Sequence, residues 1–330
     1  MKLNERVDAY QYLPNLDFDT YYDVVKDKWP WVSNLIDVDG CDTERRLVDL
    51  SSVKNEFEEN EAAGRGDSYR DAMRNTGVRS VGMSQLLQKF SSSIGNPLVL
   101  DILGGDGELA RVAASEYPHF RVLTSDLAGR MIESAMAQEI PAIRQSAEDL
   151  LLLDGSVDGV LIAYGTHHID PEQRKRAYAE GLRVLVADGS LVVHDFAPDS
   201  CVATWFREVV HPSSPAGHDY VHLSADQLTD DLTKAGAKSI SISEMYDPFI
   251  CEGTSVKAAI DNLGFYLRGM YGLTASLSDD QILERAREIF VLSAEQAERW
   301  HVSPNISVEG KHHTYRVTLP RVALVATAFK

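Results

Sequence analysis

Glycines and acidic residues gather in one short stretch, residues 99–110, which read VLDILGGDGELA. The apolar run before the glycines predicts a buried strand, and the residues after them predict a helix. Glycines in such a turn let a ligand approach the backbone, and the free N–H groups at a helix start favour acidic or polar ligand groups. The stretch therefore predicts a ligand site, with Asp101, Gly104, Gly105 and Gly107 as candidate residues.

A second acidic residue, Asp126, ends the next apolar run and is followed by Leu127. A carboxylate at this position can accept two hydrogen bonds from a ribose diol, and its charge makes those bonds stronger than neutral ones. The spacing from Asp101 suits one strand, turn, helix and strand. We therefore interpret Asp126 and Leu127 as ligand contacts; the alternative is that Asp126 caps the helix that follows.

Histidines follow a later apolar run, residues 157–163. Tyr164 comes directly after this run and is a further candidate for contact with the bound ligand, and His167 and His168 follow two residues later. An imidazole changes its charge near neutral pH, so His167 can take a proton from a reacting hydroxyl, with His168 as the second candidate. The alternative is that the two histidines only shape the pocket.

Another group of imidazoles surrounds the end of the fifth predicted strand. His194 ends that strand, and His211, His218, Tyr220 and His222 follow in a loop. We predict that His194, His218, Tyr220 and His222 contact the substrate. His194, His211, His218 and His222 could instead hold a divalent or ferric ion, but no spacing among them is diagnostic, so no metal is assigned.

Short apolar runs alternate with helical stretches from Leu98 onward, which is typical of a parallel sheet built from βαβ units. The carboxyl ends of such strands meet at one edge, so the glycine turn, Asp126 and His167 are expected at one crevice. The predicted strands are residues 98–103, 120–124, 142–144, 157–163, 190–196, 238–245 and 321–329. A turn at residues 187–189 is expected between the helix 171–186 and the fifth strand.

The chain has two additions to this core, which itself spans residues 96–252 and 318–330. Residues 1–95 predict a helical N-terminal addition, and residues 253–317 predict a helical insertion or lid, in which capping boxes at Ser278 and Ser293 begin helices. We expect both to form the substrate pocket or a homodimer interface. Their aromatic residues are candidate pocket walls: Tyr21, Tyr22, Trp29, Trp31, Phe265, Tyr266 and Tyr271.

Composition excludes several functional classes. The 330 residues carry 50 acidic and 32 basic side chains, a formal net charge of −18, which disfavours nucleic acid and anionic membranes as partners. No apolar run is long enough to span a membrane, the N-terminus lacks the apolar stretch of a signal peptide, and the three cysteines show no disulfide pattern. A cytoplasmic location is expected.

The order of these features resembles that of class I S-adenosylmethionine-dependent methyltransferases of the small-molecule type. Asp101, Gly105 and Gly107 match the family's first motif, and Leu103 stands where the family usually has another glycine. Asp126 matches the acidic residue that binds the adenosine ribose. His167 matches a histidine that serves as general base in small-molecule O-methyltransferases.

One further segment, residues 145–150, resembles the part of the family that contacts adenine. Ala147 and Glu148 match the usual pattern, whereas Ser146 stands where aspartate is common. A solvated acidic turn is the alternative interpretation of this segment.

The resemblance implies a Rossmann-like, seven-stranded, mostly parallel sheet with helices on both faces, and S-adenosyl-L-methionine as cofactor. It implies methyl transfer to a small-molecule acceptor, which we place in specialised natural-product metabolism because of the large additions. Two alternatives stay open: an enzyme of the same fold that catalyses a cyclisation or rearrangement, suggested by Leu103, and a non-catalytic ligand-binding subunit. The acceptor, the methylated atom and the oligomeric state are left open.

Overall fold

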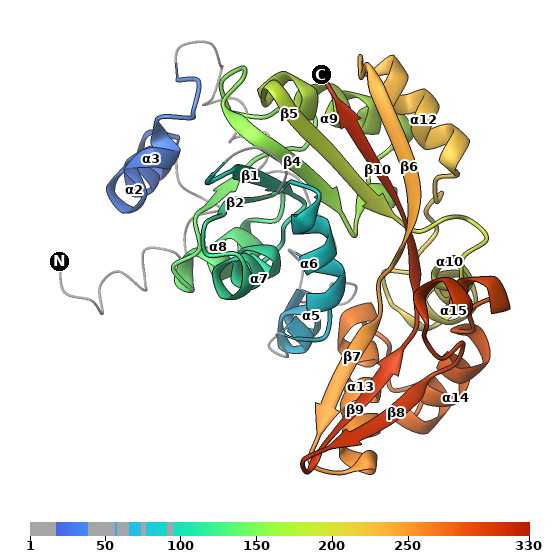
Figure 1. Ribbon diagram of the computed structural model, residues 1–330. Helices are drawn as coiled ribbons and strands as arrows, with labels where there is room; N and C mark the ends of the chain where they lie inside the picture. Colours follow the sequence, from blue (N-terminus) through green and yellow to red (C-terminus); the bar gives the residue numbers. More distant parts are fainter. Residues whose placement is uncertain (1–17, 39–56, 58–65, 74–76, 91–94) are drawn as a thin grey trace, which may run out of the picture.

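Two sheets organise the protein in a computed structural model that describes residues 18–38, 57, 66–73, 77–90 and 95–330 (Figure 1). The larger sheet has seven strands in the order β3-β2-β1-β4-β5-β10-β6, and the smaller has three in the order β7-β9-β8. In the larger sheet β10 is antiparallel to both neighbours, and the other neighbouring strands are parallel. This is the predicted Rossmann-like fold.

Every strand predicted for the larger sheet forms. Its strands are β1 (Leu98–Ile102), β2 (Arg121–Asp126), β3 (Ala142–Arg144), β4 (Val157–Ala163), β5 (Leu185–Asp195), β6 (Ser239–Tyr246) and β10 (Val322–Phe329). The predicted turn at residues 187–189 is wrong, because these residues lie within β5. In the pairing of β4 with β5, Val157 lies opposite Leu185 and Gly159 lies opposite Ser190. Residues 186–189 therefore form an irregularity in the ladder.

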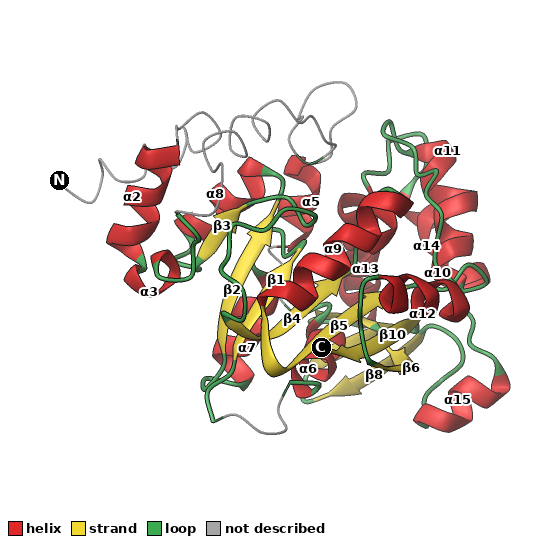
Figure 2. Ribbon diagram, turned by 90° about the horizontal axis from the view of Figure 1, so that it is seen from above, coloured by secondary structure: helices red, strands yellow, loops and turns green. Residues whose placement is uncertain are grey.

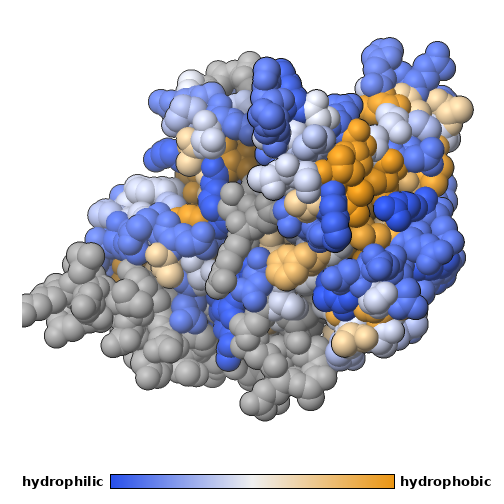
Figure 3. Space-filling view, turned by 90° about the horizontal axis from the view of Figure 1, so that it is seen from below, coloured by the Kyte–Doolittle hydropathy of each residue, from blue (hydrophilic) through white to orange (hydrophobic). Residues whose placement is uncertain are grey.

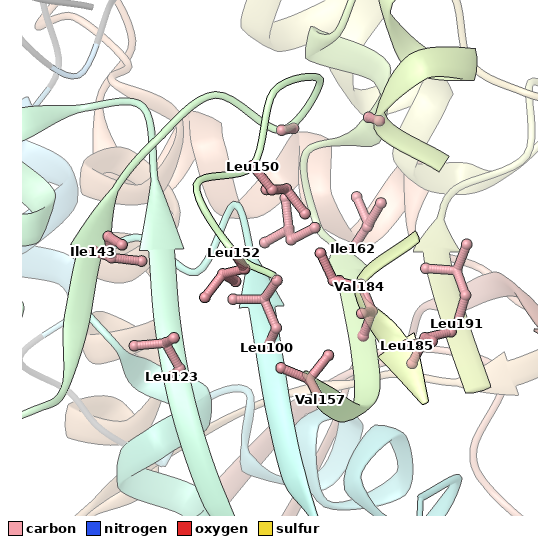
Figure 4. Packing of buried hydrophobic residues seen from close by; sticks show 14 of the residues in the cluster. Leu100, Leu123, Ile143, Leu150, Leu152, Val157, Ile162, Val184, Leu185 and Leu191 are labelled. Atoms are coloured by element: carbon pink, nitrogen blue, oxygen red, sulfur yellow. The ribbon is translucent and has the colours of Figure 1, made fainter. Parts of the chain in front are cut away.

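Helices cover both faces of the larger sheet (Figure 2). The alternation of side chains along β1 sends Leu98 and Leu100 to one face and Val99 to the other. The first face is covered by α8 (Gly129–Ala137), α9 (Pro171–Val184) and α12 (Ala225–Lys234), and Figure 4 shows part of its packing. The second face is covered by α6 (Ser80–Gln88) and α7 (Glu108–Glu116).

The N-terminal addition is helical where the structure describes it. It contains α2 (Phe18–Lys28), α3 (Pro30–Ser33), α5 (Gly66–Met73) and α6. Val25 and Val32 are fully buried and extend the core of the first sheet face. Helix α5 lies elsewhere, against α13 (Val256–Tyr271), where a Cβ on Gly269 would come within 2.8 Å of the Ser68 carbonyl oxygen.

The insertion is only partly helical, so the predicted helical insertion is incomplete. It contains α13, α14 (Asp279–Ile289) and α15 (Ala294–Trp300), and both predicted capping boxes are present. It also contributes β8 (Ser307–Lys311) and β9 (Thr314–Leu319), which pair with β7 (Phe249–Gly253). Strand β8 is mostly exposed and has no apolar face, so its sequence gives little strand signal and its pairing with β9 decides its conformation.

Figure 3 shows one face on which hydrophilic residues predominate, with a limited area of exposed hydrophobic residues toward one side. Within the described residues, no helix combines the length and the apolar character needed to cross a membrane.

Candidate active site

A cavity of about 450 Å³ lies at the carboxyl ends of β1, β2 and β4. Asp101, Gly104 and Gly105 line one end, together with Asp126 and Leu127 from the end of β2. The other end is lined by His167, His168 and aromatic side chains from other parts of the chain. We call these the glycine end and the histidine end.

Backbone conformation shapes the glycine end. Leu103 has a φ of 64°, a left-handed conformation that costs roughly 1–2 kcal/mol for a residue with a side chain. Gly105, with a φ of 57°, has nothing within 4 Å of the position a Cβ would take, so its backbone is open to the cavity. Gly107 differs, because a Cβ there would lie 2.8 Å from Ile140 Cδ1 and the residue does not line the cavity.

Two carboxylates face this open backbone. Asp126 accepts hydrogen bonds from the N–H of Gly105 at 2.9 Å and of Ala128 at 2.8 Å, so it fixes the turn and caps the following segment while it lines the cavity. Burial and the neighbouring Asp126 carboxylate raise the pKa of Asp101 to about 8. A polar ligand with a positive charge would offset both effects.

A histidine and an aspartate form a buried pair at the histidine end. His167 Nδ1 lies 2.8 and 3.0 Å from the two carboxylate oxygens of Asp195, which also accept from the N–H groups of His167 and Phe196 at 2.7 Å. Burial alone would raise the pKa of Asp195, but His167 and the Phe196 N–H lower it to about 2. The ionised Asp195 thus holds the proton on Nδ1, which leaves the lone pair on Nε2 of His167.

That Nε2 is buried and has no hydrogen-bond partner among the described residues. His167 lines the cavity, so the lone pair is available to whatever occupies the histidine end. Asp195 was not among the predicted site residues. Its position at the carboxyl end of the strand next to β4 was the signal that could have found it.

The predicted substrate contacts divide into two groups. Tyr220 lines the cavity, as does His168, the second predicted catalytic residue. His218 does not line it, although the centroid of its ring lies 5.1 Å from that of His167. The His222 ring stacks on His167 at 4.7 Å, and burial followed by the charge of His167 lowers the pKa of His222 to about 4. A second cavity, of about 420 Å³, is lined by His218, Tyr220 and His222.

His194 does not reach the cavity. Successive side chains of a strand point to opposite faces, so Asp195 points toward the site and His194 away from it. His194 is fully buried, with its ring 4.1 Å from that of Tyr164 and its Nε2 3.5 Å from Asp247 Oδ2. His211 is exposed and accepts a hydrogen bond from the N–H of His218, so the structure does not assemble the predicted set of four metal-binding histidines.

The remaining predicted cofactor contacts differ in whether they line the cavity. Tyr164 lines the cavity with a φ of 61°, and its hydroxyl donates to Asp247 at 3.0 Å. Ala147 and Glu148 do not line it, and Glu148 instead accepts a hydrogen bond from Gln173. This segment turns back on itself between Ser146 and Asp149, which the sequence pattern does not reveal.

Three of the six Phe and Tyr side chains that line the cavity, Phe57, Tyr69 and Phe206, were not among the predicted residues. Of the predicted walls among the described residues, only Tyr271 lines the cavity. Trp29 and Tyr266 are buried in the core, Tyr22 and Trp31 pack against it while partly buried, and Phe265 is exposed. The side chain of Tyr21 lies outside the described residues. The walls that were missed are Phe57, Tyr69, Phe206 and Met270. They come from segments far apart in the sequence: Tyr69 lies on α5 and Met270 on α13, whereas Phe57 and Phe206 lie on neither helix. Only the tertiary structure brings them to one cavity.

Part of the chain is similar in sequence to known methyltransferases. Residues 99–189 match the family model of a methyltransferase domain. The chain is 30% identical over 143 residues to a demethylmenaquinone methyltransferase of Thermotoga maritima, covering 39% of this chain and 62% of that protein. It is 31% identical over 134 residues to the ubiquinone/menaquinone biosynthesis C-methyltransferase UbiE of Pseudomonas fluorescens, covering 36% of this chain and 51% of that protein.

A solved structure shares the fold. Phosphoethanolamine N-methyltransferase 2 of Haemonchus contortus, crystallised with phosphomonomethylethanolamine and S-adenosylhomocysteine, superposes with a TM-score of 0.52 at 16% identity, over 84% of this chain and 61% of that one. The chain thus spans less than two thirds of the length of the curated relatives given above. These comparisons confirm the predicted resemblance to class I methyltransferases.

Proposed function

We propose that this chain, which carries a class I S-adenosylmethionine-dependent methyltransferase domain, transfers a methyl group to a small organic acceptor. The observation that carries the proposal is that one cavity joins the glycine end to a buried His167–Asp195 pair. A ligand-binding subunit would need the first end but has no use for a histidine whose lone pair faces the cavity.

The residues of the glycine end fit S-adenosylmethionine. The open backbone at Gly105 gives the ligand room for close approach, Asp126 suits a ribose diol, and Asp101 suits a positively charged group. When bound, this cofactor supplies an electrophilic methyl group on a sulfonium. Leu103 adopts the left-handed conformation that a glycine would otherwise provide, so its presence does not prevent the turn from forming.

The histidine end prepares the acceptor. Asp195 fixes the orientation of the His167 ring and stabilises positive charge on it, as a carboxylate does beside a catalytic imidazole. The Nε2 lone pair then faces the acceptor. It can take the acceptor's proton, or it can bind a cation that promotes the loss of that proton. Correct alignment of the acceptor atom supplies much of the acceleration in a direct displacement.

The cavity walls favour an acceptor with an apolar ring and an oxygen or nitrogen atom. Phe206, Tyr220 and Tyr271 offer aromatic surface at the histidine end. These residues lie outside the part of the chain that matches the methyltransferase family model, so they set a specificity of this chain's own. The quinone after which the two relatives are named is one ring acceptor of this kind, and an acceptor from specialised metabolism is another.

Binding and turnover measurements test the proposal. We expect calorimetry to show one S-adenosylhomocysteine per chain, and a panel of hydroxylated aromatics and quinols to yield methylated product and S-adenosylhomocysteine by mass spectrometry. Absence of any binding by the unaltered protein would overturn the proposal. Conversion of an acceptor without S-adenosylhomocysteine formation would favour the cyclisation or rearrangement alternative.

A further inference from the structure

Three imidazoles converge at the histidine end of the cavity. His167, His168 and His218 each offer one ring nitrogen, and the three nitrogens lie within 4.8 Å of one another. The ring centroids are 4.4 Å apart for His167 and His168, and 5.3 Å apart for His168 and His218. We propose that these three histidines bind a divalent transition-metal ion, with zinc as the reference ion.

The environment of His167 is that of a metal ligand. A metal-binding histidine commonly donates its second ring N–H to a carboxylate, which fixes the ring and makes the other nitrogen a better ligand. His167 makes this bond to Asp195 through Nδ1, and its Nε2 is buried without a hydrogen-bond partner among the described residues. A proton acceptor needs one such imidazole, whereas two more histidines converge here.

The other two ligands are held by contacts of their own. The His218 ring stacks on Phe206 at 3.7 Å with an angle of 10° between the planes, and the His218 backbone N–H donates to His211. The His168 ring packs against Tyr220 at 4.4 Å. Zinc–nitrogen bonds are about 2.0–2.1 Å long, so small rotations of the rings are required to bring the nitrogens to bonding distance.

A buried arginine joins the segments that carry the histidines. Arg174 donates to the carbonyl oxygens of Thr166 and Ile169 at 3.1 Å, on either side of His167 and His168. It also reaches the Val221 carbonyl, at 3.5 Å, in the loop that carries His218. The two loops are therefore fixed to α9, which places the ligand groups before any ion arrives.

The cavity gives the ion an open position. His167 and His168 line it, and three protein ligands with an open fourth position are characteristic of catalytic zinc. A second grouping, His167 with Asp195 and His222, is fully buried, and the Asp195 oxygens are already engaged by His167 and Phe196. We therefore assign the ion to the first grouping, where it would bind an oxygen atom of the acceptor and lower that atom's pKa.

This role rests on the proposed function, but the site itself can be tested without turnover. Full-length protein freed of metal is titrated with Zn²⁺ by calorimetry and with Co²⁺ by visible spectroscopy. We expect one tightly bound ion per chain, with cobalt bands typical of low coordination number. His168→Ala and His218→Ala should each weaken binding by at least about tenfold, and Asp195→Asn by about 10–100-fold.

A matched control uses histidines elsewhere. His312 and His313 are exposed in the turn between β8 and β9, so the His312→Ala/His313→Ala variant should bind the ion as the unaltered protein does. Circular dichroism and thermal melting establish that each variant is folded. Ion binding that is absent from the unaltered protein, or unchanged in folded His168→Ala and His218→Ala, would overturn the site.

The results of these experiments also test the ion site and the proposed methyl transfer independently of each other. Methyl transfer that persists in metal-free protein and in His168→Ala would overturn the metal role and leave His167 as the proton acceptor. Zinc binding by protein that does not bind S-adenosylhomocysteine would overturn the methyltransferase proposal and leave the ion site standing.

Discussion

The glycine end and the histidine end of the cavity are constructed differently. At the glycine end, residues 101–105 and residues 126–127 come from two neighbouring strands joined by one helix, and much of the contact surface is backbone. At the histidine end, side chains come from β5, from the segment after β4, from the loop at residues 218–222 and from both additions. One end depends on local sequence, and the other depends on tertiary contacts.

The two ends of the cavity therefore differ in how freely their residues can change. A turn whose chemistry comes from backbone N–H groups tolerates Leu103 in place of glycine, because the left-handed conformation is kept. The histidine end has no comparable constraint from one short motif. The ligand that fits the histidine end can therefore differ between proteins that share the glycine end.

The largest expected effect is at the histidine end. His167→Ala should lower kcat by roughly 10²–10⁴-fold, because it removes the only lone pair that Asp195 directs at the acceptor. S-adenosylhomocysteine affinity should change little, since its contacts are at the other end. Turnover at saturating acceptor and calorimetry of the cofactor product measure the two separately, and full turnover in a folded His167→Ala protein would remove the residue from the chemistry.

Asp126→Ala should produce the opposite pattern. Hydrogen bonds to a charged group contribute about 1.5–3 kcal/mol, so we expect S-adenosylhomocysteine to bind about 10–100-fold more weakly. Zinc binding should be unchanged. Because Asp126 also accepts from the N–H of Gly105 and Ala128, Asp126→Asn serves as a control that keeps an acceptor for the turn. Equal affinities for all three proteins would contradict the ribose role.

The pH dependence of binding gives a smaller effect at the glycine end. Burial and Asp126 raise the pKa of Asp101 to about 8, so the carboxyl is largely protonated below that pH. An ammonium group beside Asp101 favours the ionised carboxylate, so S-adenosylhomocysteine, whose amino group is protonated in this range, should bind several-fold more tightly at about pH 8 than at about pH 6, with release of a proton. Asp101→Asn should remove this dependence, and calorimetry in buffers of different ionisation enthalpy detects the proton.

The same pKa shift affects stability in the absence of ligand. A carboxyl with a raised folded-state pKa stabilises the folded protein fully at low pH, and this contribution declines as the pH rises through about 4 to about 8. Chemical denaturation should therefore show a steeper loss of stability over this window for the unaltered protein than for Asp101→Asn. Identical slopes would contradict the shift.

Two glycines of the same turn are expected to differ in how they affect stability and binding. Gly105→Ala should cost about 1 kcal/mol of unfolding free energy, from its positive φ alone, and should weaken S-adenosylhomocysteine binding. Gly107→Ala also pushes a Cβ against Ile140, which adds about 1–3 kcal/mol, but should affect binding less because Gly107 is outside the cavity lining. Thermal melts and calorimetry should show these opposite rankings.

The sequence alone was enough to predict the larger sheet, the position of each of its strands along the chain, and the glycine end of the cavity. Apolar runs of strand length and capping boxes are local signals, and residues 99–110 contain both the strand and the turn that place Asp101 and Gly105. The His167 position followed from the same rule, since it comes directly after a strand whose carboxyl end faces the crevice. These features need only neighbouring residues to specify them.

Tertiary structure decided the histidine end. The pairing of β5 with β4 brings Asp195 to His167, and the alternation of side chains along β5 turns His194 away. The packing of α5 against α13 places Tyr69 and Tyr271 on one cavity, and Arg174 fixes the loops that carry the histidines. Such contacts join residues far apart in the chain, so their geometry depends on how the whole fold packs and no local pattern encodes it.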